Sequence, residues 1–180
     1  WGKKTLEQDL IESFGGKIFN IKKNFEISTT KILEKKGGVK RNKKAIFLDR
    51  DGTIIVDKKY LTNINEIEFF PETINVLIKL MKKGYLLFII SNQSMVSRKM
   101  ASEKEAIAIN DEIVRLLNSK GIEIQESFLD FSHPDNPSKA RKPNTEFLEE
   151  ASSKYKLALK DSWVIGDKPS DIIFGKRGNT

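Results

Sequence analysis

Short apolar runs and amphipathic segments alternate along the chain from residue 45 onward. Four runs have the pattern of buried strands, and they cover residues 45–48, 85–90, 122–131 and 162–165. Four segments have apolar residues at helical spacing, and they cover residues 71–83, 102–117, 144–155 and 170–176. Strands that alternate with helices predict an α/β fold, a doubly wound, Rossmann-like parallel sheet with helices on both faces.

Local signals mark the ends of two predicted helices. Ser102 precedes its helix, and Glu105 three residues later completes a capping box. Gly84 follows the first amphipathic segment and is a helix stop signal.

A polar segment lies beyond each predicted strand. These segments are Asp49–Thr53, Ser91–Ser94, Arg141–Pro143 and Gly166–Asp171. Because right-handed crossovers place the carboxyl ends of parallel strands along one edge of a sheet, we expect the four segments to meet there. Carboxylates, a hydroxyl, an amide and a lysine would then surround one point.

Such a set of groups suits phosphoryl transfer through a covalent aspartyl-phosphate. A carboxylate can attack phosphorus only where the charge of the phosphate is neutralised, which Mg²⁺, a lysine and hydroxyl donors would do. Asp49 and Asp51 are two residues apart in an extended segment, so their side chains point the same way. The second could protonate the leaving oxygen and then activate water. Gly52 would permit a tight turn beside them.

Each polar segment also has an ordinary structural explanation when taken alone. Asp-x-Asp-Gly-Thr could close a strand, Ser-Asn-Gln-Ser could be a loop, Arg-Lys-Pro a surface turn and Gly-Asp-Lys-x-x-Asp a helix N-cap. Their common position just beyond a strand favours one functional site over four unrelated turns.

The composition limits the class of protein. The 180 residues are 38% hydrophobic and 32% charged, which is enough apolar material for a core. There is no cysteine, which excludes disulfides and thiolate zinc sites and favours a reducing compartment. No apolar run approaches the ~18–20 residues of a membrane span, and no signal-peptide pattern begins the chain. The expected location is cytoplasmic, with no membrane partner.

The net charge of +7 is concentrated in the first quarter of the chain. Residues 1–44 hold 12 basic and 5 acidic residues, whereas residues 45–180 hold 20 of each. A nucleic-acid partner is therefore not expected for the α/β region. Two glycines and a basic run indicate a linker over residues 37–44.

Residues 45–180 resemble the haloacid dehalogenase (HAD) superfamily of phosphatases. The likeness rests on the DRDGT motif, the serine after the second strand, Arg-Lys-Pro and the segment GDKPSD. Within the superfamily these residues are most similar to the D-glycero-D-manno-heptose-1,7-bisphosphate 7-phosphatases, with the histidinol-phosphatases as near relatives. The resemblance implies a HAD-like phosphatase domain with Mg²⁺ as cofactor and a small phosphorylated sugar as substrate. The pathway that it implies is the synthesis of activated heptose for lipopolysaccharide or other surface polysaccharides.

The resemblance implies a role for each motif residue. Asp49 would be the nucleophile and a Mg²⁺ ligand, and Asp51 would be the general acid and base, with its backbone carbonyl on the metal. Asp167 would complete the protein ligands of the metal. Ser91 and Lys142 would steady the transferring phosphoryl group.

Other residues would contact the substrate or support the site. Arg141 would bind a second anionic group of the substrate, and Lys168 and Asp171 would support the metal-binding segment. The remaining substrate-binding residues would be Arg50, Asp57, Tyr60, Asn92, Gln93 and Ser94.

Several departures from the family pattern bear on specificity and completeness. Many members bind zinc through three cysteines and one histidine just before Arg-Lys-Pro, but this stretch retains only His133, so we expect no zinc. Met95 stands where a glycine is usual. The connections after Gly52 and Ser91 are too short for a large cap domain. The family's last strand and helix are missing, which suggests a C-terminal truncation.

Residues 1–36 are similar to the C-terminal end of the cytidylyltransferase-like sugar-phosphate nucleotidyltransferases, through residues 15–18 and 26–32. A plain capped helix is the alternative interpretation. Because the chain also begins at Trp1, we expect part of a nucleotidyltransferase–phosphatase fusion, whose fragment here transfers no nucleotide. The hydroxyls that would contact nucleotide phosphates in such a remnant are Ser28, Thr29 and Thr30.

Four functions remain open at this point. The first is a Mg²⁺-dependent sugar-phosphate phosphatase, and the second is a histidinol-phosphatase, which only a comparison of substrates separates from it. The third is a nucleic-acid-end phosphatase or binding module, which the neutral α/β region disfavours. The fourth is a non-catalytic phosphosugar-binding remnant, which the presence of both Asp49 and Asp51 disfavours. The sequence does not indicate the anomer of the sugar or the oligomeric state.

Overall fold

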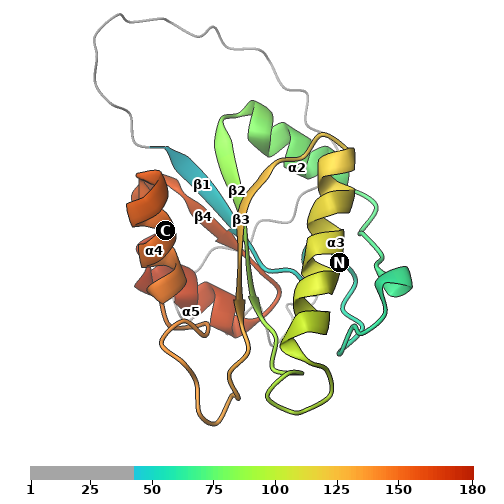
Figure 1. The fold of residues 1–180 in the computed structure, drawn as a ribbon. Coiled ribbons are helices and arrows are strands. Elements are labelled where there is room, and N and C mark those ends of the chain that lie inside the picture. Colours follow the sequence, from blue (N-terminus) through green and yellow to red (C-terminus); the bar gives the residue numbers. More distant parts are fainter. Residues whose placement is uncertain (1–42) are drawn as a thin grey trace, which may run out of the picture. The chain divides into compact units, whose positions relative to one another are not determined.

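A four-stranded parallel sheet forms the centre of the protein. The computed structural model describes residues 43–180, and the strands of its sheet lie in the order β3-β2-β1-β4 (Figure 1). All neighbouring strands are parallel, which confirms the doubly wound α/β fold expected from the sequence. The strands are β1 (Lys44–Leu48), β2 (Tyr85–Asn92), β3 (Ile124–Asp130) and β4 (Trp163–Ile165).

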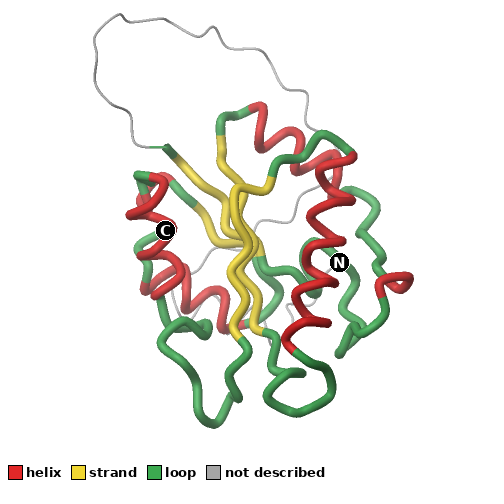
Figure 2. Tube along the Cα trace, in the orientation of Figure 1, coloured by secondary structure: helices red, strands yellow, loops and turns green. Residues whose placement is uncertain are grey.

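Helices cover both faces of this sheet, as Figure 2 shows. They are α2 (Thr73–Lys82), α3 (Glu103–Ser119), α4 (Glu146–Tyr155) and α5 (Pro169–Arg177), with short 3₁₀ helices η1 (Ile64–Glu66) and η2 (Leu159–Asp161). One apolar core joins Ile46 of β1 to Ile113 of α3, and another joins Phe47 of β1 to Leu148 of α4. Successive residues of β1 thus face opposite cores, as the alternation of a strand requires.

The helix ends follow the sequence signals, except that two helices begin two residues later than predicted. Ser102 Oγ accepts a hydrogen bond from the Glu105 N–H at 3.2 Å, and Glu105 Oε2 accepts one from the Ser102 N–H at 2.7 Å, so the expected capping box is present. Gly84 ends the turn after α2 with φ of +80°. α2 begins at Thr73, whose N–H donates to the Phe70 carbonyl at 3.1 Å. α4 begins at Glu146, because the Asn144 N–H donates to the Arg141 carbonyl at 2.8 Å and holds Asn144 in a turn.

The strand order creates a switch point between β1 and β4. The chain adds β2 and β3 on one side of β1 and then returns to add β4 on the other side. Open α/β sheets bind ligands at the carboxyl ends of the strands at such a point. The pairing of β1 with β4 continues into Asp49, whose N–H donates to the Ile165 carbonyl at 2.8 Å. Asp49 and Gly166 therefore begin the two sides of the crevice.

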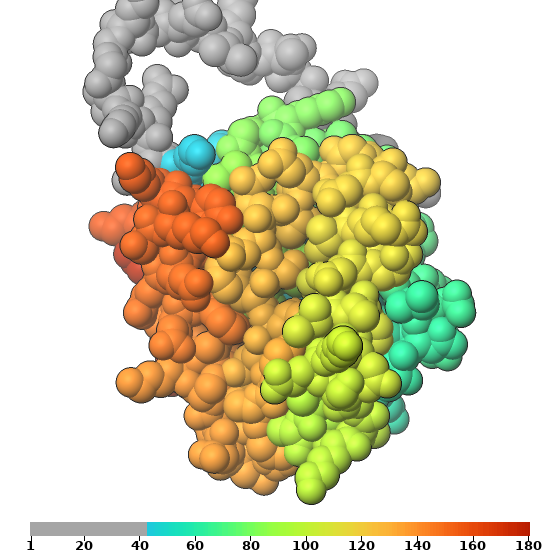
Figure 3. All heavy atoms as spheres, viewed as in Figure 1, coloured from blue at the N-terminus to red at the C-terminus, as the bar shows by residue number. Residues whose placement is uncertain are grey.

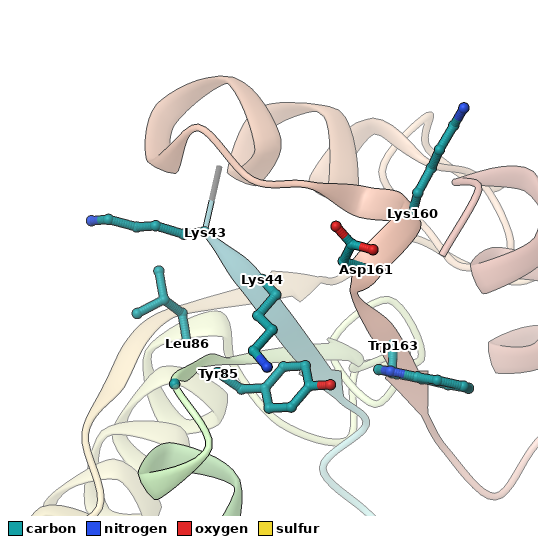
Figure 4. A pocket seen from close by; sticks show the side chains of 8 residues that line it. Lys43, Lys44, Tyr85, Leu86, Lys160, Asp161 and Trp163 are labelled. Carbon is teal, nitrogen blue, oxygen red and sulfur yellow. The ribbon is translucent and has the colours of Figure 1, made fainter. Parts of the chain in front are cut away.

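A separate hollow of about 850 Å³ lies at the opposite edge of the sheet, where β1, β2 and β4 begin (Figure 4). There the Lys44 ammonium lies 4.2 Å from the centroid of the Tyr85 ring, and Trp163 and Lys160 form part of the wall. No residue that the sequence assigns to the functional site lines this hollow. The predicted chemistry belongs to the carboxyl edge.

Part of the sequence interpretation concerns residues that the structure does not describe. Ser28, Thr29 and Thr30 precede residue 43, as does most of the expected linker. The nucleotidyltransferase-like remnant and the domain boundary therefore remain predictions. Within residues 43–180, no helix has the length and apolar character needed to cross a membrane.

Candidate active site

Lys142 lies between two buried carboxylates at the carboxyl edge of the sheet. Its Nζ donates to Asp49 Oδ1 at 2.7 Å and to the Ile90 carbonyl at 2.8 Å, and it lies 2.6 Å from Asp171 Oδ1. Two of the three protons of the ammonium group thus have hydrogen-bond acceptors, and the contact with Asp171 is an ion pair. Asp49, Lys142 and Asp171 are each at most 5% exposed. With both carboxylates ionised, the cluster carries one net negative charge almost out of contact with water.

Burial raises the pKa of Asp49 to about 6. The loss of hydration is the main cause, the positive charge of Lys142 opposes it, and the negative charge of Asp171 adds to it. A raised pKa means that the protein holds the ionised carboxylate at a higher free energy than water does. A further cation near Asp49 would therefore lower the free energy of its ionised carboxylate.

Asp167 forms a group of three carboxylates with Asp49 and Asp171. One oxygen atom from each lies within 4.8 Å of the others. Two glycines provide the space, because a Cβ at Gly52 would overlap the Asp167 carboxylate and a Cβ at Gly166 would overlap that of Asp171. Hard oxygen ligands gathered in this way suit Mg²⁺, so the residues present fit the ion that the sequence predicts. The structure also places Asp171 in this group directly, and not only beside it.

Asp51 is held from two sides. The Arg50 Nε and Nη2 atoms donate to its two oxygens, each at 3.1 Å. Gln93 Nε2 donates to Asp51 Oδ2 at 2.8 Å and to Ser91 Oγ at 2.7 Å. The segments that follow β1 and β2 are thus joined through side chains. Arg50 and Gln93, which the sequence assigns to substrate binding, orient the predicted acid and base.

Asn92 fixes the backbone of the residue that carries the buried ammonium. Its Nδ2 donates to the Lys142 carbonyl at 3.0 Å, and its Oδ1 accepts from the Lys142 N–H at 3.1 Å. Both hydrogen bonds bridge 50 positions of the sequence. Lys142 is therefore anchored at its backbone by Asn92 and at its side chain by β1, β2 and α5.

A pocket of about 310 Å³ opens beside Asp51. Lys168 Nζ lies at its wall, 3.6 Å from Asp57 Oδ2 and 3.9 Å from Asp167 Oδ1. Partial burial lowers the pKa of Lys168, but the carboxylates of Asp49, Asp167 and Asp57 outweigh burial and raise the pKa overall. Apart from Arg141, all six residues that are expected to bind substrate line this pocket. The complete lining is Arg50, Asp51, Asp57, Lys59, Tyr60, Leu61, Asn92, Gln93, Ser94, Met95 and Lys168.

Arg141 and His133 lie outside the lining of this pocket. Arg141 Nη1 donates to the Ser132 carbonyl at 3.0 Å and to Asp130 Oδ1 at 3.4 Å. His133 Nδ1 accepts from the Asp135 N–H at 3.2 Å, within the same loop. The predicted substrate contact of Arg141 therefore needs a substrate that extends beyond the pocket.

Sequence reasoning missed three residues of this region. Lys59 and Leu61 line the pocket from the connection after β1, and the hydrophobic pattern gives no signal for them. Asp130 is 5% exposed and ends β3. Its position at the end of a strand is the same signal that identified Asp49, so the sequence contained the information needed to find it.

The sequence matches one described family over most of its length. The family described as "Polynucleotide kinase 3 phosphatase" matches residues 44–176. The D-glycero-alpha-D-manno-heptose-1,7-bisphosphate 7-phosphatase of Photorhabdus laumondii is 36% identical over 141 residues, which are 74% of this chain and 77% of the relative.

Solved structures agree with the architecture. A HAD-like phosphatase of Mesorhizobium loti aligns with a TM-score of 0.73 and 30% identity, over 79% of this chain and 73% of the other. The D,D-heptose 1,7-bisphosphate phosphatase of B. bronchiseptica, solved with magnesium and phosphate, aligns with a TM-score of 0.69 and 24% identity, over 75% of this chain and 76% of the other. The second likeness shows a shared fold. The family match and the relatives together show that the chain belongs to the Polynucleotide kinase 3 phosphatase family of HAD-like phosphatases.

Proposed function

We propose that this phosphatase is Mg²⁺-dependent, uses Asp49 as its nucleophile and acts on a phosphorylated heptose. The observation that carries the proposal is the Asp49–Lys142 contact of 2.7 Å inside a group of three carboxylates. Asp51 follows two residues later and is oriented by Arg50 and Gln93. This arrangement supports Asp49 as the residue that attacks phosphorus and Asp51 as the residue that moves protons.

In the first step, a carboxylate oxygen of Asp49 attacks the phosphorus atom, and the bond from phosphorus to the sugar oxygen breaks. Asp51 gives its proton to the departing sugar oxygen. Asp49, Asp167 and Asp171, with the Asp51 carbonyl, would hold Mg²⁺, which would supply positive charge to offset the charge of the phosphate. Lys142 keeps the Asp49 carboxylate ionised and aimed. The product is an aspartyl-phosphate on Asp49 and a free sugar hydroxyl.

In the second step, water attacks the phosphorus atom of the aspartyl-phosphate, the bond from phosphorus to the Asp49 oxygen breaks, and inorganic phosphate leaves as the Asp49 carboxylate is regenerated. Asp51, now a carboxylate, accepts the proton of this water, so each turnover returns it to its starting form. Arg50 and Gln93 hold the Asp51 carboxylate in place during both proton transfers. Ser91, whose Oγ accepts from Gln93, donates its own proton toward the phosphoryl oxygens.

The pocket beside Asp51 suits the phosphate-bearing part of a sugar. Lys59 and Lys168 line it, and both side chains attract phosphate. The naming of the Photorhabdus relative favours heptose over histidinol phosphate, which is the alternative substrate. We therefore propose D-glycero-D-manno-heptose 1,7-bisphosphate, hydrolysed at the 7-phosphate to leave the 1-phosphate.

The test is phosphate release from the α and β anomers of this bisphosphate and from histidinol phosphate, each with Mg²⁺ and with a chelator. We expect Mg²⁺-dependent release from at least one heptose anomer and much weaker release from histidinol phosphate. Asp49→Asn should abolish turnover, and Asp111→Asn, an exposed carboxylate on α3, should not change it. Higher kcat/KM for histidinol phosphate would reject the heptose assignment. Turnover by Asp49→Asn would reject the nucleophile.

A nucleic-acid end is the second candidate substrate. The description of the matching family favours it, as does the charge of +7. The equal numbers of acidic and basic residues in the range 45–180 oppose it. An oligonucleotide with a 3′-phosphate, tested at two salt concentrations, decides between them, because an electrostatically bound nucleic-acid substrate loses affinity steeply with salt.

We also propose that the phosphatase acts beside a sugar-phosphate nucleotidyltransferase encoded upstream in the same chain. The support is the resemblance of residues 1–36, with Ser28, Thr29 and Thr30, to the end of such an enzyme. The phosphatase removes the 7-phosphate and leaves a sugar 1-phosphate, which is the kind of substrate that a sugar-phosphate nucleotidyltransferase uses. Assay of the full-length natural protein for nucleotidyl transfer to the heptose 1-phosphate tests this link.

A further inference from the structure

The loop between β3 and Lys142 has a defined shape although it contains little regular structure. Residues 131–140 form no helix and no named strand, and they contain no cysteine. The loop contributes to the molecular surface, in orange in Figure 3. It delivers Arg141 and Lys142 to the site, so whatever fixes the loop also determines where these two cations lie.

A single buried carboxylate lies beneath this loop. Asp130 Oδ1 accepts from the Ser132 N–H at 3.1 Å and from Ser132 Oγ at 2.5 Å, and Asp130 Oδ2 accepts from Ser138 Oγ. A buried carboxylate is stable only where hydrogen bonds or a counter-charge replace its water, and here both are present. We name Asp130, Ser132 and Ser138 the Asp130 cluster.

The cluster extends to the residues that enter the site. Ser138 Oγ accepts from the N–H groups of Ala140 and Arg141, each at 3.1 Å. The Ser138 N–H in turn donates to Ser132 Oγ at 3.1 Å. The start and the end of the loop are thus cross-linked through one carboxylate and two hydroxyls.

Asp130 also contacts the guanidinium of Arg141. Arg141 Nη1 donates to Asp130 Oδ1 at 3.4 Å and to the Ser132 carbonyl at 3.0 Å. Within residues 43–180, these two contacts use only one nitrogen of the guanidinium, so Nε and Nη2 keep their donors for a ligand. The side chain is 12% exposed and is thus held at one nitrogen of its guanidinium.

The two cations depend on the cluster to different degrees. Lys142 has its own anchors, since Asn92 binds its backbone and Asp49 and the Ile90 carbonyl bind its Nζ. Arg141 has no side-chain anchor among residues 43–180 outside the cluster. Loss of the cluster should therefore misplace Arg141 far more than Lys142.

We propose that Asp130 is a positioning residue that holds Arg141 for a second anionic group on the substrate. The proposal rests on the proposed function in one respect, namely that the substrate is a sugar bisphosphate. It predicts that Asp130 controls the preference for a bisphosphate over a monophosphate and contributes little to the chemical step itself.

The kinetic test compares heptose 1,7-bisphosphate with heptose 7-phosphate, which has the same leaving group and lacks the second anion. For Asp130→Asn we expect a loss of about tenfold or more in kcat/KM for the bisphosphate, mainly through KM. The loss for the 7-phosphate should stay within about twofold. Arg141→Ala should show the same selective loss, and the double variant should lose little more than either single variant. Asp135→Asn, a 90% exposed aspartate in the same loop, is the control and should match the parent.

Limited proteolysis tests the cross-link without any activity. Lys139 is exposed in the loop, and the bond after it is a trypsin site. Asp130→Asn and Ser138→Ala should each speed cleavage at this bond by about tenfold, since each removes hydrogen bonds that join the loop ends. Asp135→Asn should leave the rate unchanged.

The outcomes separate this proposal from the proposed function. If no phosphate ester is hydrolysed, the proposed function fails, while the cleavage rates still decide whether Asp130 fixes the loop. If Asp130→Asn lowers kcat/KM equally for both substrates, Asp130 is a general structural residue and the positioning role is wrong. If Asp130→Asn does not fold, Ser138→Ala carries the same two tests. Parent-like proteolysis and kinetics in Ser138→Ala and Asp130→Asn would overturn the proposal.

Discussion

Lys142 Nζ and Asp49 Oδ1 lie 2.7 Å apart although 93 positions of the sequence separate the two residues. The same ammonium lies 2.6 Å from Asp171 Oδ1, so one cation balances two carboxylates that are both nearly buried. The contact joins the first strand of the sheet to the loop before α4 and to the last helix. The charge balance of the site and its three-dimensional assembly therefore depend on the same atom.

Replacement of this cation should unbalance the cluster. Lys142→Met leaves Asp49 and Asp171 buried without their counter-charge, and we expect the free energy of unfolding to fall by about 3–5 kcal/mol in the absence of Mg²⁺. Saturating Mg²⁺ should restore part of the loss, because an ion held by Asp49, Asp167 and Asp171 would offset some of the unbalanced negative charge. Urea denaturation with and without Mg²⁺ measures both effects. Lys154→Met is the control, since an ion pair in contact with water, such as that of Lys154 with Glu126, contributes little to stability. Equal losses in the two variants would contradict the expectation.

The raised pKa of Asp49 predicts a conflict between stability and function. Its value of about 6 in the folded protein lies above the ordinary 3.8, so the folded state binds this proton more tightly than the unfolded state does. The ionised carboxylate therefore opposes folding at pH 7, and this penalty shrinks as the pH falls from about 6 toward about 4.

Asp49→Asn should remove that penalty along with the activity. Without Mg²⁺ at pH 7 we expect the variant to be more stable than the parent by about 2–3 kcal/mol, and the difference should shrink at pH 5. With saturating Mg²⁺ the difference should narrow or reverse, because only the parent keeps the full set of carboxylates. Denaturation curves at the two pH values provide the measurement. A parent that is more stable than the variant at pH 7 without Mg²⁺ would show that Asp49 gains more from Lys142 than it loses by burial.

The loss of kcat/KM on replacing Asp51 should be larger for substrates with poorer leaving groups. Asp51→Asn keeps a side chain of the same size and removes the proton that the sugar oxygen needs, so we expect a loss of about 10²–10⁴-fold in kcat/KM on the sugar phosphate. Aryl phosphates leave without much protonation, and the loss on them should be smaller. Steady-state rates and a burst-phase measurement on the aryl substrate separate the two steps. Equal losses on both substrates, with no accumulation of phosphorylated enzyme, would argue against a leaving-group acid.

Gly52 and Gly84 form a matched pair for testing the cation site. Both have positive φ values, +88° and +80°, so an alanine strains the backbone at either position. A Cβ at Gly52 meets the Asp167 carboxylate, whereas a Cβ at Gly84 meets nothing within 4 Å. We expect both variants to be destabilised by about 1 kcal/mol or more, but only Gly52→Ala should lose Mg²⁺ affinity, by about tenfold or more. Calorimetric titration with Mg²⁺ measures this, and equal affinities in the two variants would count against metal binding by Asp167.

The sequence predicts the sheet and the meeting of the polar segments because both follow from periodicity. An apolar run long enough for a strand must be buried, and parallel strands bring their carboxyl ends together regardless of side-chain detail. Asp49, Asp167 and Lys142 could be placed near one another on these grounds alone. Periodicity fixes the bounds of a strand less finely: within residues 122–131, which are predicted to hold a strand, β3 runs from Ile124 to Asp130.

The contacts between individual side chains of the site could not be predicted from periodicity. Arg50 pairs with Asp51 and Asn92 binds the Lys142 backbone, and in each case the sequence assigned the residue to substrate alone. Such contacts depend on the rotamers and depths of side chains that meet only after the sheet has formed. The presence of Asp171 in the group of carboxylates could not be predicted for the same reason. Asp171 lies in the first turn of α5, and the sequence does not indicate the direction in which this helix leaves the strand.

The strand β4 is only three residues long and pairs with β1 along one side. Its continuation carries Asp167 and Asp171, so a brief separation of residues 163–177 from the sheet would remove two of the three candidate metal ligands together. A bound cation then penalises that opening and leaves openings elsewhere unaffected. Amide hydrogen exchange in β4 and α5 should consequently slow when Mg²⁺ is added, while exchange in α2 and α3 stays the same. Bound Mg²⁺ would thus keep β4 and α5 attached to the rest of the sheet.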